Sequence, residues 1–376
     1  MKKILKMVGI ALLSFVLIII LGVTLFLTFS PQFGKSPSKA QKQEFAKTDH
    51  YEDGKFVNRS ASPMNIDIIE NLKEFTKKAP ERSPAKAIDP LKIDSAQIAN
   101  HPDSSTQLIW FGHSTFLLQI NGLKLLLDPM FGDVPSPHPF LGEKRYSNEL
   151  PIEIENLPQI DAVIFSHDHY DHLDYKSVKK LKDKVDHFFV PLGLGSHLQY
   201  WGVAGEKIQE LDWWQETQFR GLRLACTPAR HFSGRGLFDR AATLWASWVI
   251  QSKDDNIYFS GDSGYDEHFK KIGEKYGPFD FAMLECGQYN EDWKYIHMMP
   301  EETAQAAVDL RAKLAMPIHW GAFTLAFHSW TDPVVRVKAK AKELGVNLIT
   351  PQIGEAIELG ALDLPQKEWW LKYVED

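Results

Sequence analysis

Six consecutive residues carry the chemistry around which this chain of 376 residues is organised. They read His167-Asp168-His169-Tyr170-Asp171-His172, the pattern H-x-H-x-D-H. Neutral imidazole nitrogens and carboxylate oxygens are the ligands that zinc-type divalent ions bind when no thiolate is available. The pattern therefore predicts a metal site, and the alternative is a histidine-rich loop that lies in solvent.

The position of this motif suits a metal site. It follows a short apolar run at residues 162–165, which is typical of a buried strand, and it precedes a predicted helix that begins after Asp174. Residues two apart in an extended chain point the same way, so His167 and His169 can bind one ion. Asp171 and His172 come from the following turn and can face a second ion beside the first.

Three further residues with the same ligand chemistry end apolar segments later in the chain. His231 closes the run Thr-Pro-Ala-Arg-His, Asp262 lies in Ser-Gly-Asp-Ser-Gly, and His319 closes Met-Pro-Ile-His. Taken alone, each of them is more typical of a buried histidine, a histidine at a strand end or an aspartate in a turn than of a metal ligand. Their order behind the H-x-H-x-D-H motif favours one shared metal centre.

Composition narrows the class of protein. The net charge of −7 and the isoelectric point near 6.1 give no support for nucleic-acid binding. The two cysteines, Cys226 and Cys286, exclude a disulfide framework or a cysteine-rich zinc site. Each lies in an apolar run and is expected to be a buried free thiol, although the sequence leaves a bridge between them open.

Residues 7–29 form an uncharged apolar run that predicts a membrane anchor. The run exceeds the ~20 residues needed to cross the hydrocarbon core. It is also longer than the ~7–15 residue core of a cleaved signal peptide, which is the alternative. The basic start, with Lys2, Lys3 and Lys6, favours a cytoplasmic N-terminus and places the rest of the chain on the non-cytoplasmic side, although lysines follow the run as well.

The rest of the chain divides by composition. We expect an anchor at residues 1–29, a proline-rich linker and wrapping segment at 30–102, and a globular domain with the metal motif at 103–376. An Asn121-Gly122 pair predicts a hairpin, and the proline-rich stretch 130–151 is a candidate lid or groove wall. The predicted strands are residues 108–111, 115–120, 123–127, 162–165, 187–192, 222–226, 244–250, 256–260, 281–285 and 316–319, with helices at 300–313 and 332–344. This order predicts an α/β (α+β) fold of two sheets packed face to face, with helices outside.

With these motifs in place, the chain resembles the metallo-β-lactamase superfamily over roughly residues 107–360. Within it, the sequence is most similar to the branch of N-acylphosphatidylethanolamine-hydrolysing phospholipase D. The segments that carry the closer similarity are Trp-Phe-Gly-His-Ser-Thr at 110–115, the motif at 167–174, Leu-Asp-Trp-Trp at 211–214, Phe-Ser-Gly-Asp-Ser-Gly-Tyr at 259–265 and Ile-His-Trp-Gly at 318–321. The resemblance implies an αβ/βα four-layer sandwich with two metal ions at the strand ends.

The resemblance also implies how the ligands are shared between two zinc ions. One ion would be bound by His167, His169 and His231, the other by Asp171, His172 and His319, and Asp262 would bridge both. Ligands divided in this way leave coordination positions open, as a catalytic site requires. Such an ion pair lowers the pKa of a water molecule that attacks the substrate, so Asp171 and Asp262 are the predicted catalytic carboxylates.

Other residues have weaker roles. The resemblance implies that Tyr170 and His297 contact the substrate, and the alternatives are ordinary packing for Tyr170 and a histidine at a helix start for His297. His113 is expected beside the ligands in a structural role. Trp213 and Trp214 are expected at the edge of the core, with a membrane-facing role as the alternative.

Together these features predict a membrane-anchored, zinc-dependent phosphodiesterase. Its expected partners are the bilayer and a phospholipid of the N-acylphosphatidylethanolamine type, cleaved to phosphatidic acid and an N-acylethanolamine. A lactonase or another small-molecule metallo-hydrolase of the same fold is one alternative. A non-catalytic anchored module with structural metals is another, which open coordination disfavours. The sequence favours no particular oligomeric state.

Overall fold

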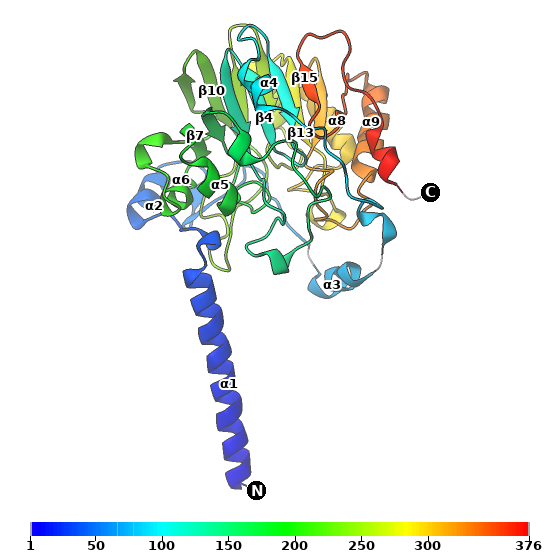
Figure 1. The fold of residues 1–376 in the computed structure, drawn as a ribbon. Helices are drawn as coiled ribbons and strands as arrows, with labels where there is room; N and C mark the ends of the chain where they lie inside the picture. Colours follow the sequence, from blue (N-terminus) through cyan, green and yellow to red (C-terminus); the bar gives the residue numbers. More distant parts are fainter. Residues whose placement is uncertain (1, 66, 78, 375–376) are drawn as a thin grey trace.

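A long helix, α1 (Lys2–Phe29), projects from an otherwise globular chain in the computed structural model (Figure 1). The structure describes residues 2–65, 67–77 and 79–374. No residue of α1 is buried against the rest of the described chain, and the helix is long and apolar enough to cross a membrane. This helix is therefore a candidate anchor, as the uncharged run at 7–29 predicts.

Two mixed sheets pack face to face in the globular part of the chain, and α1 projects from one end of it (Figure 1). Seven strands form the first sheet, in the order β15 (Ala356–Glu358), β3 (Gln107–Trp110), β4 (Phe116–Ile120), β5 (Leu123–Leu127), β6 (Ile160–Ile164), β7 (Val185–Pro191) and β8 (Ile208–Leu211). Six strands form the second, in the order β14 (Ala315–Ile318), β13 (Phe281–Glu285), β12 (Asn256–Phe259), β11 (Ser247–Gln251), β10 (Leu222–Thr227) and β9 (Glu216–Phe219). Each sheet joins an antiparallel meander to parallel strands, so both sheets are mixed.

Helices cover the outer face of each sheet. The first sheet carries α4 (Ser95–Ala99), α5 (Tyr175–Leu181) and α6 (Gly195–Tyr200), and the second carries α7 (His268–Tyr276) and α8 (Pro300–Asp309), with α9 (Asp332–Leu344) against α8. Along β4, Phe116 and Leu118 face the core between the sheets, whereas Leu117 faces the helices. Successive side chains of a strand point to opposite faces, so this strand, all of whose residues are buried, is covered on both sides. The predicted αβ/βα four-layer sandwich is confirmed.

Local signals in the sequence match many of these elements. The turn Asn121-Gly122 joins β4 and β5 with φ values of 52° and 74°, as a two-residue hairpin turn of this kind requires. The strand predicted at 244–250 begins instead at Ser247, and the helix predicted at 300–313 ends at Asp309. Arg311 has a φ of 56°, which a helix cannot accommodate. Strands β8, β9 and β15 were not predicted.

The segment before the sandwich lies on its surface and contributes to its core. It contains α2 (Lys39–Phe45), the hairpin of β1 (Tyr51–Glu52) and β2 (Lys55–Phe56), and α3 (Ile68–Thr76). Phe45, Phe56 and Ile88 are buried in the core between the sheets. The division at residue 102 stays a prediction, since the core draws side chains from both sides of it. Cys226 and Cys286 are both buried and free, as predicted.

Candidate metal centre

The predicted ligands come from strand ends that meet at one edge of the sandwich. His167, His169, Asp171 and His172 lie between β6 and α5, where His172 and Leu173 both donate backbone hydrogen bonds to His169. Asp174 ends this loop as the N-cap of α5, since its Oδ2 accepts from Ser177 N at 2.8 Å. His231, Asp262 and His319 follow β10, β12 and β14, respectively.

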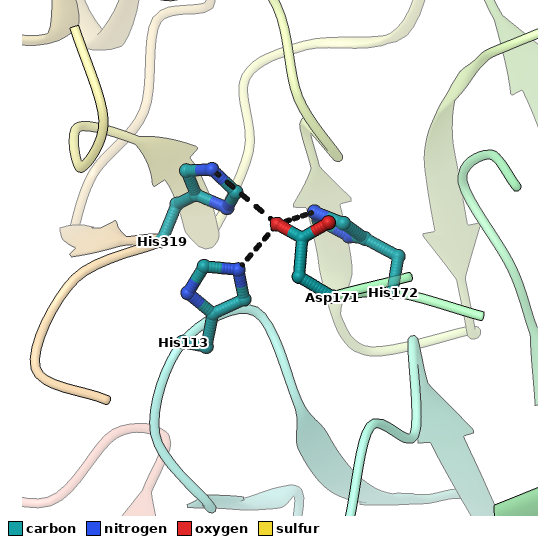
Figure 2. A group of neighbouring side chains, drawn as sticks. All are labelled: His113, Asp171, His172 and His319. Atoms are coloured by element: carbon teal, nitrogen blue, oxygen red, sulfur yellow. Dashed lines mark hydrogen bonds and ion pairs between the residues drawn. The ribbon is translucent and has the colours of Figure 1, made fainter. Parts of the chain in front are cut away.

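Folding brings these side chains into two adjoining groups. In the first group, His167, His169, His231 and Asp262 each offer one ligand atom, and these atoms lie within 4.8 Å of one another. The second group meets the same limit and contains His113, Asp171, His172 and His319. In Figure 2 the carboxylate of Asp171 lies between the three imidazoles of this second group.

Asp262 lies between the two groups. Its Oδ1 is 3.0 Å from His319 Nδ1 and its Oδ2 is 3.1 Å from His172 Nε2. The same Oδ2 is 3.7 Å from His167 Nε2 and 3.8 Å from His231 Nε2. One carboxylate thus approaches imidazoles of both groups, which is the arrangement that a bridging ligand requires.

The residues fit a pair of divalent cations. His172 Nε2 and Asp262 Oδ1 are buried, and neither has a partner with hydrogen-bond geometry. Such atoms are costly to bury unless a further group satisfies them. Nitrogen and carboxylate oxygen are also a suitable donor set for zinc-type ions. The predicted ligand roles stay predictions, and the geometry and the donor chemistry agree with them.

Lowered pKa values keep several imidazoles of this site in the neutral form that binds a metal. Burial lowers the pKa of His169 to about 4, and burial together with neighbouring imidazoles holds the pKa of His167 and His319 well below the usual value. These rings are neutral at pH 7, and the neutral ring is the form that binds a metal. His172 differs, because Asp262, Asp171 and Asp128 outweigh the effect of burial and raise its pKa well above the usual value. An excess of negative charge therefore surrounds His172, which a cation would neutralise.

Asp128 supports the site and was missed in the sequence. Its fully buried carboxylate accepts from Ser166 N at 2.7 Å and from His172 Nδ1 at 2.7 Å. Because Nδ1 is occupied in this way, Nε2 of His172 is the nitrogen that faces the site. The position of Asp128 directly after β5 repeats the strand-end signal of the predicted ligands, so the sequence did contain a pointer to it.

His113 joins the two sheets at the site. Its Nε2 is 2.8 Å from Asp171 Oδ2, and its carbonyl accepts from His319 N at 3.0 Å. His113 N in turn donates to Trp320 O at 3.2 Å. Its expected structural role beside the ligands agrees with these contacts, because one residue orients the Asp171 carboxylate and fixes the backbone of His319.

A cavity of about 270 Å³ opens onto these groups. His169, Asp171, Asp262 and His319 line it on one side. Its remaining wall is mostly apolar and comprises Met64, Phe232, Trp293, Ile296 and Leu325, with Gln288 and His297. The site therefore combines a charged floor with an apolar wall.

Two residues predicted to contact the substrate differ in position. His297 lines the cavity, and its Nδ1 lies 3.2 Å from Oε1 of the fully buried Glu285. This contact turns His297 Nε2 away from Glu285. Tyr170 is not among the residues of the cavity wall, because its hydroxyl donates to Arg235 O and its ring lies 4.1 Å from the Arg235 guanidinium. A role of Tyr170 at the substrate stays a prediction.

The tryptophan pair and the proline-rich loop lie at the periphery. Trp213 is buried, donates from Nε1 to Trp245 O at 2.7 Å and stacks on His50, while Trp214 stacks on Tyr276. Both tryptophans thus pack at the edge of the core, as predicted. The loop 130–151 contacts the chain after His319 through Tyr146 N, which donates to Ala322 O at 2.8 Å. Its function as a lid stays a prediction.

Comparison with known proteins agrees with this geometry. A family model described as the β-lactamase superfamily domain matches residues 124–320, and the chain belongs to the metallo-β-lactamase superfamily. An uncharacterized protein of Mycobacterium tuberculosis is 41% identical over 327 residues, which are 85% of this chain and 87% of that protein. N-acyl-phosphatidylethanolamine-hydrolyzing phospholipase D 1 of Caenorhabditis elegans is 36% identical over 256 residues, which are 65% of this chain and 71% of that enzyme.

The fold also matches a solved structure. Igni18, a metallo hydrolase from the archaeon Ignicoccus hospitalis, superposes with a TM-score of 0.53 at 20% identity, covering 69% of this chain and 100% of that chain. Family, fold and site together define a metallo-β-lactamase-fold hydrolase with a divalent-metal site at the His/Asp cluster.

Proposed function

We propose that this protein is a membrane-anchored, zinc-dependent phosphodiesterase that hydrolyses phospholipids of the N-acylphosphatidylethanolamine type. The products would be phosphatidic acid and an N-acylethanolamine. The observation that carries this proposal is the joint presence of the His/Asp cluster and an apolar cavity wall in a chain similar to a phospholipase of that specificity. The uncharged run at residues 7–29 of α1 supports delivery at a bilayer. In this proposal the catalytic domain would lie on the non-cytoplasmic side.

The chemistry divides between the ions and the side chains. When bound, two zinc ions supply Lewis-acid polarisation of the phosphoryl oxygens and a water molecule of lowered pKa. His167, His169 and His231 would bind one ion, Asp171, His172 and His319 the other, and Asp262 both. Asp128 and His113 hold His172 and Asp171 in the orientation that this arrangement needs.

His297 is the side chain proposed to bind the head group. Burial alone would lower its pKa, but the hydrogen bond to Glu285 and the charge of that carboxylate raise it above the usual value. The raised pKa favours the protonated ring, in which the Nδ1–H points towards Glu285 and the Nε2–H faces the cavity. From there Nε2 can donate to an oxygen of the phosphate or of the departing alcohol.

The apolar wall fits the lipid part of such a substrate. Phe232, Trp293 and Leu325 bring carbon surface next to the charged floor, and burying an apolar group against such surface is favourable. A small polar phosphodiester would use only the floor of the cavity. The proposal therefore predicts a preference for diesters that carry acyl chains.

The direct test incubates the zinc-loaded full chain with a panel of phospholipids and analyses the products by mass spectrometry. Release of phosphatidic acid and N-acylethanolamine, lost on chelation and restored by zinc, is the expected result. Hydrolysis of lactones with no phospholipid turnover would contradict the proposal and favour the other hydrolase class. Unfolding on chelation without any turnover would favour a structural role for the metal.

The His297→Ala variant separates head-group binding from metal binding. We expect kcat/KM for the lipid to fall about 10- to 100-fold, as is typical for the loss of a hydrogen bond to a charged group, with zinc content unchanged. His297→Gln, which keeps a side-chain donor, should recover part of the activity. A loss of zinc in His297→Ala would instead assign this ring to the ligand set, as its position near Asp262 and His319 permits.

A further inference from the structure

The segment that leaves α1 is fastened to the sandwich at three points. Pro31 O accepts from Trp201 Nε1 at 2.7 Å, and Gln32 O accepts from Arg235 Nε at 2.9 Å and from its Nη2 at 2.8 Å. Lys35 N donates to His197 Nδ1 at 2.9 Å. Figure 1 shows α1 leaving the sandwich beside α2 and α6.

The same side chains also hold the loop of the metal ligands. Arg235, which is 4% exposed, donates through Nη1 to Leu173 O at 2.8 Å and to Asp168 O. His197 Nε2 lies 3.3 Å from Asp168 Oδ2. One buried guanidinium and one buried imidazole therefore connect the exit of α1 to the H-x-H-x-D-H loop.

Gly34 shows how closely this segment approaches the sandwich. Its φ is 71°, and a Cβ atom built on it would lie 2.1 Å from His197 Nδ1. No other residue fits this position without moving His197. The exit of α1 is thus a fixed part of the catalytic domain, and the face of the domain around it has a defined distance from the helix.

The loop that contains Phe140 and Leu141 lies beside the C-terminal end of α1, where this helix would leave the membrane. Phe26 lies one turn inside the apolar end of α1, about 5 Å from it at the rise of an α-helix. The ring of His138 is 4.8 Å from the ring of Phe26 and stacks on Phe140 at 5.4 Å. Phe140 and Leu141 are 74% and 52% exposed, so two apolar side chains face outward at this level.

A second loop with exposed apolar residues is bonded to the exit of α1. Leu237 and Phe238 are 68% and 93% exposed, and they follow Arg235, which is bonded to Gln32. Phe232, three residues before Arg235, lines the active-site cavity. These exposed apolar residues thus lie in a loop that joins the exit of α1 to the mouth of the site.

We propose that Phe140-Leu141 and Leu237-Phe238 form a bilayer-contact surface around the exit of α1, which inserts into the lipid interface and turns the active-site cavity towards the membrane. Exposed apolar pairs of this kind mark membrane or protein contacts. The direct continuity with the uncharged run at residues 7–29, which is long and apolar enough to cross a membrane, selects lipid as the partner. This inference rests on the anchor of the proposed function, and it is independent of the substrate.

The test measures depth in the membrane with the full chain in phosphatidylcholine vesicles. The native thiols, Cys226 and Cys286, are fully buried, so a cysteine placed at position 140 or 238 can be labelled selectively with a fluorophore. A lipid with a nitroxide near its head group quenches labels at the interface, and a lipid with a nitroxide deep in its acyl chain quenches labels at the bilayer centre, where position 17 would lie. Leu17→Cys in α1 is the positive control. Leu362→Cys is the negative control, because it is fully exposed in the segment after β15, at the end of the sandwich away from α1 (Figure 1).

We expect Phe140→Cys and Phe238→Cys labels to be quenched several-fold more than the Leu362→Cys label. Quenching as weak as at position 362, with position 17 quenched, would overturn the contact surface. No quenching at position 17 would overturn it together with the anchor. Measuring hydrolysis on the same samples distinguishes this proposal from the proposed function. Quenched labels at positions 140 and 238 without lipid turnover would support the bilayer-contact surface and contradict the proposed phospholipid substrate.

A paired substitution gives a second readout. Phe140→Ser combined with Phe238→Ser should lower lipid turnover in vesicles several-fold and leave turnover in detergent micelles unchanged, whereas Leu362→Ser should change neither. Equal turnover of the paired variant and the parent protein in vesicles would overturn the proposal.

Discussion

Asp262→Asn should lower phospholipid hydrolysis by more than the roughly 100-fold that is typical of an outer-shell partner of a metal, because Asp262 approaches both ligand groups. Its carboxylate lies 3.0 Å from His319 and 3.1 Å from His172, and burial raises its pKa to about 6. The amide keeps the shape of the side chain but removes the charge that two cations would share. We expect zinc content, measured by atomic emission, to fall with activity while the circular dichroism of the fold is retained.

Asp254→Asn is the matched control for this change. Asp254 is exposed in the turn between β11 and β12, so the same substitution is made just before the strand that leads to Asp262. It should leave both hydrolysis and zinc content unchanged. Full activity with two bound zinc ions in Asp262→Asn would show that Asp262 does not bridge the ions.

The site could be predicted from the sequence wherever a ligand type coincides with a strand end. His231, Asp262 and His319 share that signal, and the structure brings them to the H-x-H-x-D-H loop. Asp128 has the same signal but acts through a hydrogen bond to His172, 44 residues away. No local pattern reports such a partner.

Tyr170 is a residue whose position in the sequence suggested contacts that the structure does not contain. Its position between two predicted ligands suggested a place at the substrate, yet its ring lies against Arg235, 65 residues along the chain. A cation–π contact depends on where two distant segments cross, which periodicity does not encode. The hydrogen bonds of Arg235 and His197 to the segment after α1 could not be predicted either, because they also join segments that are distant in the sequence.

The predicted strand boundaries were wrong where residues are buried but do not form the backbone pairs of a strand. Leu244 and Ala246 are buried and apolar, which suggested strand residues, but their backbone N–H groups donate to Leu192 O and Ser166 O, just beyond the ends of β7 and β6 of the other sheet. Apolar pattern reports burial and not the hydrogen-bond partner. Strands β8 and β9 are short and partly exposed, so their polar residues gave no period-2 signal.

We also expect a large loss of activity and stability when Gly287 is replaced by alanine, because the backbone of His319 leaves no space for a side chain at this position. Gly287 follows β13, and a Cβ atom on it would lie 1.5 Å from His319 O and 2.2 Å from His319 C. Both obstructing atoms belong to the backbone, so no rotamer change can relieve the clash. Gly287→Ala must therefore displace His319, whose backbone N–H is bonded to His113 O.

Overpacking of this kind costs about 1–3 kcal/mol of unfolding free energy, and occasionally more. We expect Gly287→Ala to lower the Tm in calorimetry, to lose zinc and to hydrolyse lipid poorly. Gly205→Ala is the matched control, because the nearest atom to its Cβ would be Gln199 Nε2 at 3.6 Å, an ordinary contact at the end of a flexible side chain. Since both changes add one methyl group, a difference between them isolates the contact with His319. If Gly287→Ala kept its zinc and its activity, the backbone of His319 could move without loss of the site, and a rigid placement of this ligand by β13 and His113 would be wrong.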